Sequence, residues 1–251
     1  MEPKLIAGNW KMHGTLAECI ALASALREKA RNQTERGCEF VVFPPTHLLV
    51  PVGHVIAGTG IGLGGQDCHV ARFGPYTGNV SAAMLRDVGC RYVIVGHSER
   101  RGPHGETDGQ VRSKAQAGIR EGITPIVCVG ETTEDYAAGR ATSVISRQLI
   151  ASVPDTAMPE RIAVAYEPIW AIGASSSATI DHIGNIHSAI RSTLGGIFGR
   201  DKALAIRILY GGAVGPESAP RILQTVDVDG VLVGRASLNA AHFLSLGAPS
   251  N

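Results

Sequence analysis

The sequence contains little cysteine and no cysteine pattern. Its five cysteines are an odd number, and none of them form a Cys-x-x-Cys motif. Such usage is not typical of a disulfide framework or of a zinc module. Several of the cysteines lie in apolar runs, which indicates reduced thiols in the core of a cytoplasmic protein. They are Cys19, Cys38, Cys68, Cys90 and Cys128.

The chain also has no excess of charge of either sign. Lys and Arg total 23 and Asp and Glu total 22, so the formal net charge is only +1, and no basic or acidic block occurs. This balance argues against a nucleic-acid surface and against a polybasic membrane anchor. No apolar run is long enough to cross a bilayer, and residues 1–10 contain no signal-peptide core. We therefore expect a cytoplasmic protein that binds neither nucleic acid nor membranes.

What the sequence does contain is a series of short apolar runs rich in Val and Ile. They show no clean polar–apolar alternation, which is typical of parallel strands that are buried on both faces. The eight runs are Lys4–Gly8, Glu39–Phe43, Ile61–Gly65, Arg91–Gly96, Thr124–Val129, Arg161–Tyr166, Ile206–Tyr210 and Gly230–Val233.

Longer segments with helical periodicity separate these runs. In Leu16–Arg31, apolar residues recur on one stripe and charged residues lie outside it. In Thr179–Leu194, polar residues precede the apolar stripe, as at a capped helix start. The segment after Pro44 is the least regular. The other helical segments are Thr107–Gly122, Ala141–Val153 and Glu217–Thr225.

Eight strand-then-helix units over 251 residues predict an α/β protein with a single (β/α)₈ barrel domain spanning residues 1–251. No linker-like change in composition divides the chain. A doubly wound open sheet is the competing fold, but no Gly-x-Gly-x-x-Gly follows the first strand. Because barrel enzymes place their chemistry at the carboxyl ends of the strands, the residues after each run are the candidates for function.

The sixth run ends in a carboxylate, Glu167, and Pro168 stops the strand directly after it. Bulky apolar residues come next, and then a tip of small residues from Gly173 to Ala178. A carboxylate at a strand end, succeeded by such a loop, indicates a general base under a closing lid. The alternative is a strand-ending glutamate beside a solvated loop.

Polar side chains come after the first and fourth strands as well. Asn9 and Lys11 lie two residues apart, so both would point the same way if the extended backbone continues past the strand. His97 precedes Ser98 and Glu99, which look like the start of a short helix. A helix N-terminus disfavours positive charge, so we expect a neutral His97 that donates a hydrogen bond.

Glycine-rich turns come after the last two strands, at Gly211–Gly212 and at Gly234. Backbone N–H groups in such turns can bind an anion, and barrels often hold phosphate after strands seven and eight. His69 lies beside Cys68, but no second set of ligands has metal-binding spacing, so we expect no metal site.

Characteristic motifs surround these strand ends. They read Ala7-Gly-Asn-Trp-Lys-Met12, Val95-Gly-His-Ser-Glu-Arg-Arg101, Gly105-Glu-Thr-Asp108, Ala165-Tyr-Glu-Pro-Ile-Trp-Ala-Ile-Gly173, Tyr210-Gly-Gly212 and Asp229-Gly-Val-Leu-Val-Gly234. In this order and at these separations they resemble the triosephosphate isomerase family, over essentially the whole chain.

The resemblance implies the interconversion of dihydroxyacetone phosphate and D-glyceraldehyde 3-phosphate. Glu167 would take a proton from one carbon and return it to its neighbour, while neutral His97 donates to the substrate oxygens. Lys11, held near Asn9, would stabilise negative charge, and Glu99 would support Lys11 and His97. No metal or organic cofactor is implied.

The resemblance also implies a phosphate site and a lid. The lid, Pro168–Ala178, would exclude water and bring the Gly173 N–H group onto the phosphate. Asn9 and Lys11 would contact the substrate as well. The backbone around Ala213, Gly234 and Arg235 would complete the phosphate site.

Four positions depart from the family's usual pattern. The lid tip reads Ala174-Ser175-Ser176-Ser177 where Thr-Gly-Lys-Thr is common. Ala213 replaces a serine that usually helps to bind phosphate, and Arg235 replaces a glycine. The Arg235 guanidinium could contact phosphate or point into solvent, and we expect the solvent position. Asn79 replaces an acid, which would weaken a pairing with Arg100 between subunits.

The resemblance further implies a homodimer formed through the long segment Gln66–Ser81, in which Phe73 and Tyr76 favour docking over a floppy loop. The substrate would be a small phosphorylated sugar. Two alternatives stay open. The first is an isomerase of a related four-carbon sugar phosphate, and the second is a non-catalytic phosphate-binding barrel.

Overall fold

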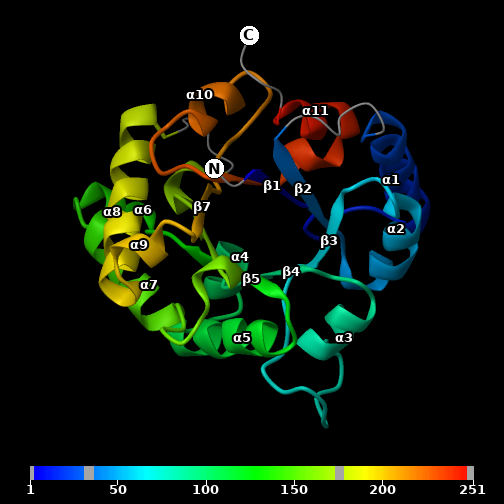
Figure 1. Cartoon of the computed structure of the whole chain (residues 1–251), viewed down its shortest axis with the longest axis horizontal. Helices are drawn as coiled ribbons and strands as arrows, with labels where there is room; N and C mark the ends of the chain where they lie inside the picture. The colour runs from blue at the N-terminus through cyan, green and yellow to red at the C-terminus, as the bar shows by residue number, and fades with distance from the viewer. Residues whose placement is uncertain (1–2, 31–36, 173–177, 248–251) are drawn as a thin grey trace.

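The computed structural model describes residues 3–30, 37–172 and 178–247. Eight parallel strands form a closed barrel in which each strand pairs with its neighbours in sequence and the last strand pairs with the first (Figure 1). The strands are β1 (Lys4–Asn9), β2 (Cys38–Phe43), β3 (Gly62–Gly65), β4 (Tyr92–Val95), β5 (Thr124–Val129), β6 (Ala163–Tyr166), β7 (Arg207–Tyr210) and β8 (Gly230–Val233).

Helices connect successive strands and surround the barrel (Figure 1). The longer ones are α1 (Leu16–Ala30), α2 (Leu49–Ile56), α5 (Asp108–Arg120), α7 (Ala141–Ser152) and α8 (Ile180–Phe198). The shorter ones are α3 (Ala82–Asp87), α4 (Ser98–Arg101), α6 (Thr133–Ala137), α9 (Arg200–Ala203), α10 (Ala219–Leu223) and α11 (Ala240–Ser245). The 3₁₀ helices are η1 (Thr46–Leu48), η2 (Pro159–Arg161), η3 (Ile169–Ala171) and η4 (Arg235–Leu238).

The (β/α)₈ prediction is confirmed, and each predicted strand begins and ends within two residues of the observed one. The predicted cap of α8 is present, because the Thr179 hydroxyl accepts the His182 N–H group at 3.2 Å. The helix runs on past the predicted end at Leu194 and stops at Gly199, whose φ of +88° suits glycine. The irregular segment after Pro44 forms η1 and α2.

Residues alternate between the two faces of the barrel wall, and both faces are apolar. The inward-facing residues form one cluster, which fills the barrel so that it is not a pore. Glycines on β3 make room for large side chains, since a Cβ at Gly64 would lie 2.3 Å from the Phe43 ring. The inner cluster comprises Leu5, Ala7, Val41, Phe43, Tyr92, Ile94, Ile126, Cys128, Ala163, Ala165, Leu209 and Leu232.

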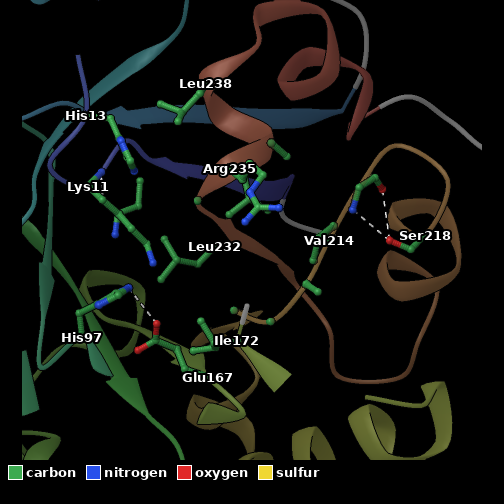
Figure 2. A pocket seen from close by; sticks show the side chains of 18 residues that line it. Lys11, His13, His97, Glu167, Ile172, Val214, Ser218, Leu232, Arg235 and Leu238 are labelled. Atoms are coloured by element: carbon green, nitrogen blue, oxygen red, sulfur yellow. Dashed lines mark hydrogen bonds and ion pairs between the residues drawn. The ribbon is translucent and has the colours of Figure 1, made fainter. Parts of the chain in front are cut away.

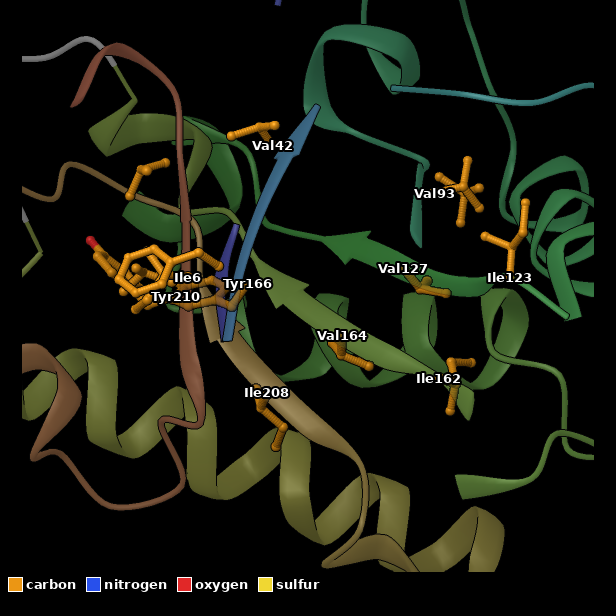
Figure 3. Packing of buried hydrophobic residues seen from close by; sticks show 14 of the residues in the cluster. Ile6, Val42, Val93, Ile123, Val127, Ile162, Val164, Tyr166, Ile208 and Tyr210 are labelled. Atoms are coloured by element: carbon orange, nitrogen blue, oxygen red, sulfur yellow. The ribbon is translucent and has the colours of Figure 1, made fainter. Parts of the chain in front are cut away.

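Outward-facing residues of the same strands pack against the helices in a second, larger cluster (Figure 3). Val127 of β5, Val164 of β6 and Ile208 of β7 succeed one another around the wall in this layer. Burial on both faces explains why the strands lack polar–apolar alternation. Within the described residues, no helix combines the length and the apolar character needed to span a membrane.

Candidate functional site

A pocket of about 700 Å³ lies at the carboxyl ends of the strands (Figure 2). It brings together most of the site residues predicted from the sequence: Asn9, Lys11, His97, Glu167, Ala213, Gly234 and Arg235. Glu99 is not among the lining residues, but it contacts Lys11. The predicted phosphate contact of Gly173 and the lid tip, residues 174–177, lie outside the described residues.

Lys11 reaches the pocket by a route that differs from the expected one. Strand β1 ends at Asn9, and Lys11 adopts a left-handed backbone conformation with φ of +53°. The Asn9 side-chain oxygen accepts the Lys11 N–H group at 2.9 Å, and the Gln66 amide donates to the Lys11 carbonyl at 2.8 Å. These two bonds hold a conformation that costs a non-glycine residue free energy. The expected extended backbone was wrong, although both side chains line the pocket.

The Lys11 ammonium group is paired and partly enclosed. Its Nζ lies 2.6 Å from Oε1 of Glu99, whose own side chain is largely exposed. Gly234 packs against the lysine stem, because a Cβ built there would lie 3.2 Å from Lys11 Cε. Lys11 is therefore fixed by a carboxylate on one side and by the turn after β8 on another.

Glu167 is buried, with 3% of the residue exposed, and its carboxylate is bound by donors from the start of α4. The Ser98 N–H group donates to Oε2 at 2.9 Å, and His97 Nε2 lies 3.0 Å from Oε1 (Figure 2). Burial raises the pKa of Glu167, but His97 and the Ser98 N–H group outweigh it and hold the pKa below its usual value. The candidate base is thus ionised and held by other groups.

The geometry around His97 fixes which nitrogen carries its proton. His97 caps α4, and its Nδ1 accepts the Glu99 N–H group at 3.2 Å. Nδ1 therefore carries no hydrogen, and Nε2 donates to Glu167, as a neutral ring does. Burial lowers the pKa of His97, but the Glu167 carboxylate raises it more strongly, so the pKa lies above its usual value. Lys11 opposes this rise.

Two glycines confine Glu167 sterically. A Cβ at Gly130 would lie 1.9 Å from the Glu167 carbonyl oxygen, and a Cβ at Gly211 would lie 2.9 Å from Glu167 Cγ. The backbone is held across the same strands, because the Glu167 N–H group donates to Val129 at 2.8 Å and the Gly211 N–H group donates to Tyr166 at 2.7 Å. A side chain at Gly130 would displace the Glu167 backbone, and a side chain at Gly211 would displace the Glu167 side chain.

A buried polar cluster adjoins Glu167 along the chain and was not predicted from the sequence. Oε1 of Glu131, which is fully buried, accepts the Tyr166 hydroxyl at 2.9 Å and the Trp170 Nε1–H group at 2.6 Å. His182 contacts the same hydroxyl at 3.0 Å, and Tyr136 stacks on Trp170 at a centroid distance of 4.0 Å. The cluster ties the residues on both sides of Glu167 to α6 and α8.

The turns after β7 and β8 form the other end of the pocket. Gly212, Ala213, Gly234 and Arg235 all line it, as expected for an anion site built from backbone groups. Ser218 tightens the first turn, because its hydroxyl accepts the Gly215 N–H group at 3.0 Å. The Arg235 guanidinium points into the pocket, not away from it as we expected (Figure 2).

Comparisons with known proteins agree with this geometry. Residues 4–248 match the family described as triosephosphate isomerase. The chain belongs to the triosephosphate isomerase family. Among its curated relatives, triosephosphate isomerase from Afipia carboxidovorans is 47% identical over 96% of this chain and 95% of its own length. Triosephosphate isomerase from Xanthobacter flavus is 48% identical with the same coverage of both chains.

A solved structure shows the same fold. The crystal structure of triosephosphate isomerase from Bartonella henselae superposes with a TM-score of 0.89, at 40% identity over 98% of each chain. The chain is accordingly an isomerase with the fold of this family. Within the described residues, no group of three or more His, Cys, Asp or Glu side chains is placed to hold a metal ion.

The steric fit at Gly211 gives the first prediction. Gly211→Ala should lower kcat at least tenfold, because the added methyl group displaces the Glu167 side chain by a few tenths of an ångström or more. Gly109→Ala on α5 is the matched control, since its Cβ would meet nothing within 4 Å. Steady-state kinetics of both variants check this, and equal kcat values would contradict it.

The His97–Glu167 pair gives a second prediction. Glu167→Gln should lower the pKa of His97, because the carboxylate that raises it is gone while burial and Lys11 still lower it. An NMR titration of the histidine ring nitrogens measures the change. The internal control is His187, whose pKa burial lowers to about 4, and it should not respond. An unchanged His97 titration would show that Glu167 does not set its charge.

Proposed function

We propose that Glu167, His97 and Lys11 catalyse the interconversion of dihydroxyacetone phosphate and D-glyceraldehyde 3-phosphate in this member of the triosephosphate isomerase family. The observation that carries the proposal is their convergence on one pocket from three strands, β6, β4 and β1. A carboxylate, an N–H donor and a cation at one place are the groups needed to remove a proton next to a carbonyl.

The reaction begins when Glu167 takes a proton from the carbon that carries the hydroxyl group, next to the substrate carbonyl. The electron pair left behind forms the carbon–carbon double bond of an enediolate, and negative charge moves onto the carbonyl oxygen. His97 Nε2–H donates a hydrogen bond to that oxygen, and Lys11 Nζ stabilises the charge. Glu167 then returns the proton to the neighbouring carbon, and the hydroxyl proton moves between the two oxygens with His97.

The observed hydrogen bonds define what substrate binding changes. Glu167 must leave the Ser98 N–H group to reach a substrate carbon, and His97 Nε2–H must leave Glu167 to reach a substrate oxygen. Loss of these two donors removes the largest of the contributions that lower the pKa of Glu167. The carboxylate therefore becomes a stronger base as the substrate takes its partners.

The phosphate of the substrate binds, in this proposal, at the turns that contain Ala213, Gly234 and Arg235, at the other end of the pocket from Glu167 (Figure 2). Asn9 holds Lys11 toward the substrate, and Glu99 orients both Lys11 and His97. The chemistry requires no metal or organic cofactor, because the carboxylate and the two donors suffice for proton transfer.

A third prediction concerns the base itself. Glu167→Gln should reduce kcat by about 10²–10⁴ with either triose phosphate, because the amide cannot accept the proton. Phosphate binding should change little. A scaffold protein without catalysis would show no turnover before or after the change, and retention of full turnover in the variant would contradict the assignment of Glu167.

The same assay decides between substrates. Turnover of D-glyceraldehyde 3-phosphate should greatly exceed turnover of a four-carbon ketose phosphate such as erythrulose 1-phosphate. Preference for the four-carbon substrate would show that the departures at Ala213 and Arg235 have changed the substrate range while keeping the acid–base chemistry.

We also propose that the chain is a single domain, acts in the cytoplasm and forms a homodimer through the segment Gln66–Ser81. The segment projects from the barrel between β3 and α3 (Figure 1), and it leaves Phe73 67% and Tyr76 45% exposed. Its first residue, Gln66, donates to the Lys11 carbonyl and to the Phe43 carbonyl, both at 2.8 Å. Docking of this segment would therefore steady Lys11.

The fourth prediction tests this link. Dilution below the dimer dissociation constant should lower kcat per subunit, because the loosened segment no longer holds Gln66 against the strained turn at Lys11. Light scattering and turnover, measured over the same concentration series, report both quantities. A monomer with undiminished kcat would contradict the link between the dimer and Lys11.

A further inference from the structure

We propose that the Arg235 guanidinium binds the phosphate of the substrate directly, and that this contact compensates for the hydroxyl group that Ala213 lacks. The inference rests on the proposed function, and it adds a specificity-determining side chain to a site that otherwise depends on backbone groups. It predicts that phosphate affinity in this chain depends on the charge of one arginine.

The position of Arg235 in the fold supports the first half of the proposal. Arg235 opens η4 directly after Gly234, at the carboxyl end of β8. Its side chain extends into the pocket between Leu232 and Val214 (Figure 2). It is exposed, so it can move onto a bound anion without disturbing the core.

The charges in the pocket also support phosphate binding by Arg235. Glu167 is the only carboxylate among the described lining residues, and the Ser98 N–H group and His97 hold it at the far end. Lys11 is paired with Glu99 at 2.6 Å. Arg235 has no carboxylate partner within the described residues, so it is the unpaired permanent cation of this pocket. A guanidinium group of this kind suits the paired oxygens of a phosphate dianion.

The second half of the proposal concerns Ala213. It lies on the turn after β7, is exposed, and lines the same pocket as Arg235. A methyl group there cannot donate to a phosphate oxygen, and the neighbouring Ser218 hydroxyl is already bonded to the Gly215 N–H and carbonyl groups. The turn after β7 therefore supplies no free hydroxyl, whereas the turn after β8 supplies a cation.

A contact to the phosphate forms when the substrate or the free anion binds, before any proton moves. Its loss therefore appears in the affinity for inorganic phosphate, which involves no chemical step, and in KM for the substrate. An exposed ion pair is also weakened by salt, whereas a hydroxyl contact is much less so. These two properties distinguish a binding role for Arg235 from a structural one.

The fifth prediction uses inorganic phosphate as the probe. Arg235→Gln should raise the inhibition constant of phosphate, and KM for D-glyceraldehyde 3-phosphate, by about tenfold at low ionic strength. Arg235→Lys keeps the charge and should recover most of the affinity. Arg147→Gln, which removes an equal charge from the outer face of α7, is the matched control and should change neither constant.

A double-mutant cycle tests the compensation. Ala213→Ser should improve phosphate affinity more in the Arg235→Gln background than in the parent chain, since the added hydroxyl then replaces a missing contact. Equal gains in both backgrounds would overturn the compensation. The phosphate contact would be overturned if the inhibition constant of phosphate were unchanged in Arg235→Gln. It would also be overturned if that constant kept its full dependence on salt concentration in this variant.

The design also separates this inference from the proposed function. Direct calorimetric titration with phosphate reports on Arg235 whether or not the chain turns over substrate. Weak phosphate binding in Arg235→Gln without any isomerase activity in the parent would refute the proposed function alone. Normal activity with unchanged phosphate binding in Arg235→Gln would refute the role of Arg235 alone.

Discussion

The structure of the site depends on one buried carboxylate, Glu167, that is held by donors from a single turn. Burying Glu167 without partners would cost several kcal/mol, and that cost would raise its pKa and protonate it. The Ser98 N–H group and His97 Nε2–H remove the cost. Both donors belong to the turn that starts α4, so this turn holds the carboxylate of the residue that follows β6.

The order of the strands in the sheet makes that contact possible. Glu167 and His97 are 70 residues apart in sequence, and only the pairing of β4 with β5 and of β5 with β6 brings their ends together. The fit is close enough that Gly130 and Gly211 tolerate no Cβ beside Glu167. The glycines that follow β5 and β7 therefore set the position of the carboxylate. The donors that follow β4 keep it ionised.

Local patterns in the sequence were enough to predict the eight strands and the residues that end them. They did not predict hydrogen bonds between distant segments, such as Gln66 to Lys11 or Trp170 to Glu131, because no local pattern encodes such contacts. They placed Lys11 at the site for the wrong reason, since the strand ends before Lys11 and a left-handed turn comes next. A glycine at a strand end can indicate that another segment packs closely against it. Gly211, which packs against Glu167, was such a signal, and we did not use it.

Every charged group near the reacting end of the pocket already has a partner before substrate binds: Lys11 has Glu99, and Glu167 has His97 and Ser98. Substrate binding therefore exchanges hydrogen-bond partners among groups that are already in place. In this exchange, His97 Nε2–H passes from a Glu167 oxygen to a substrate oxygen. The donors do not have to be desolvated or reoriented at the moment of reaction, which is the condition under which electrostatic stabilisation lowers a barrier most. The same exchange frees Glu167 from the donors that weaken it as a base, so that binding and activation of the base are one event.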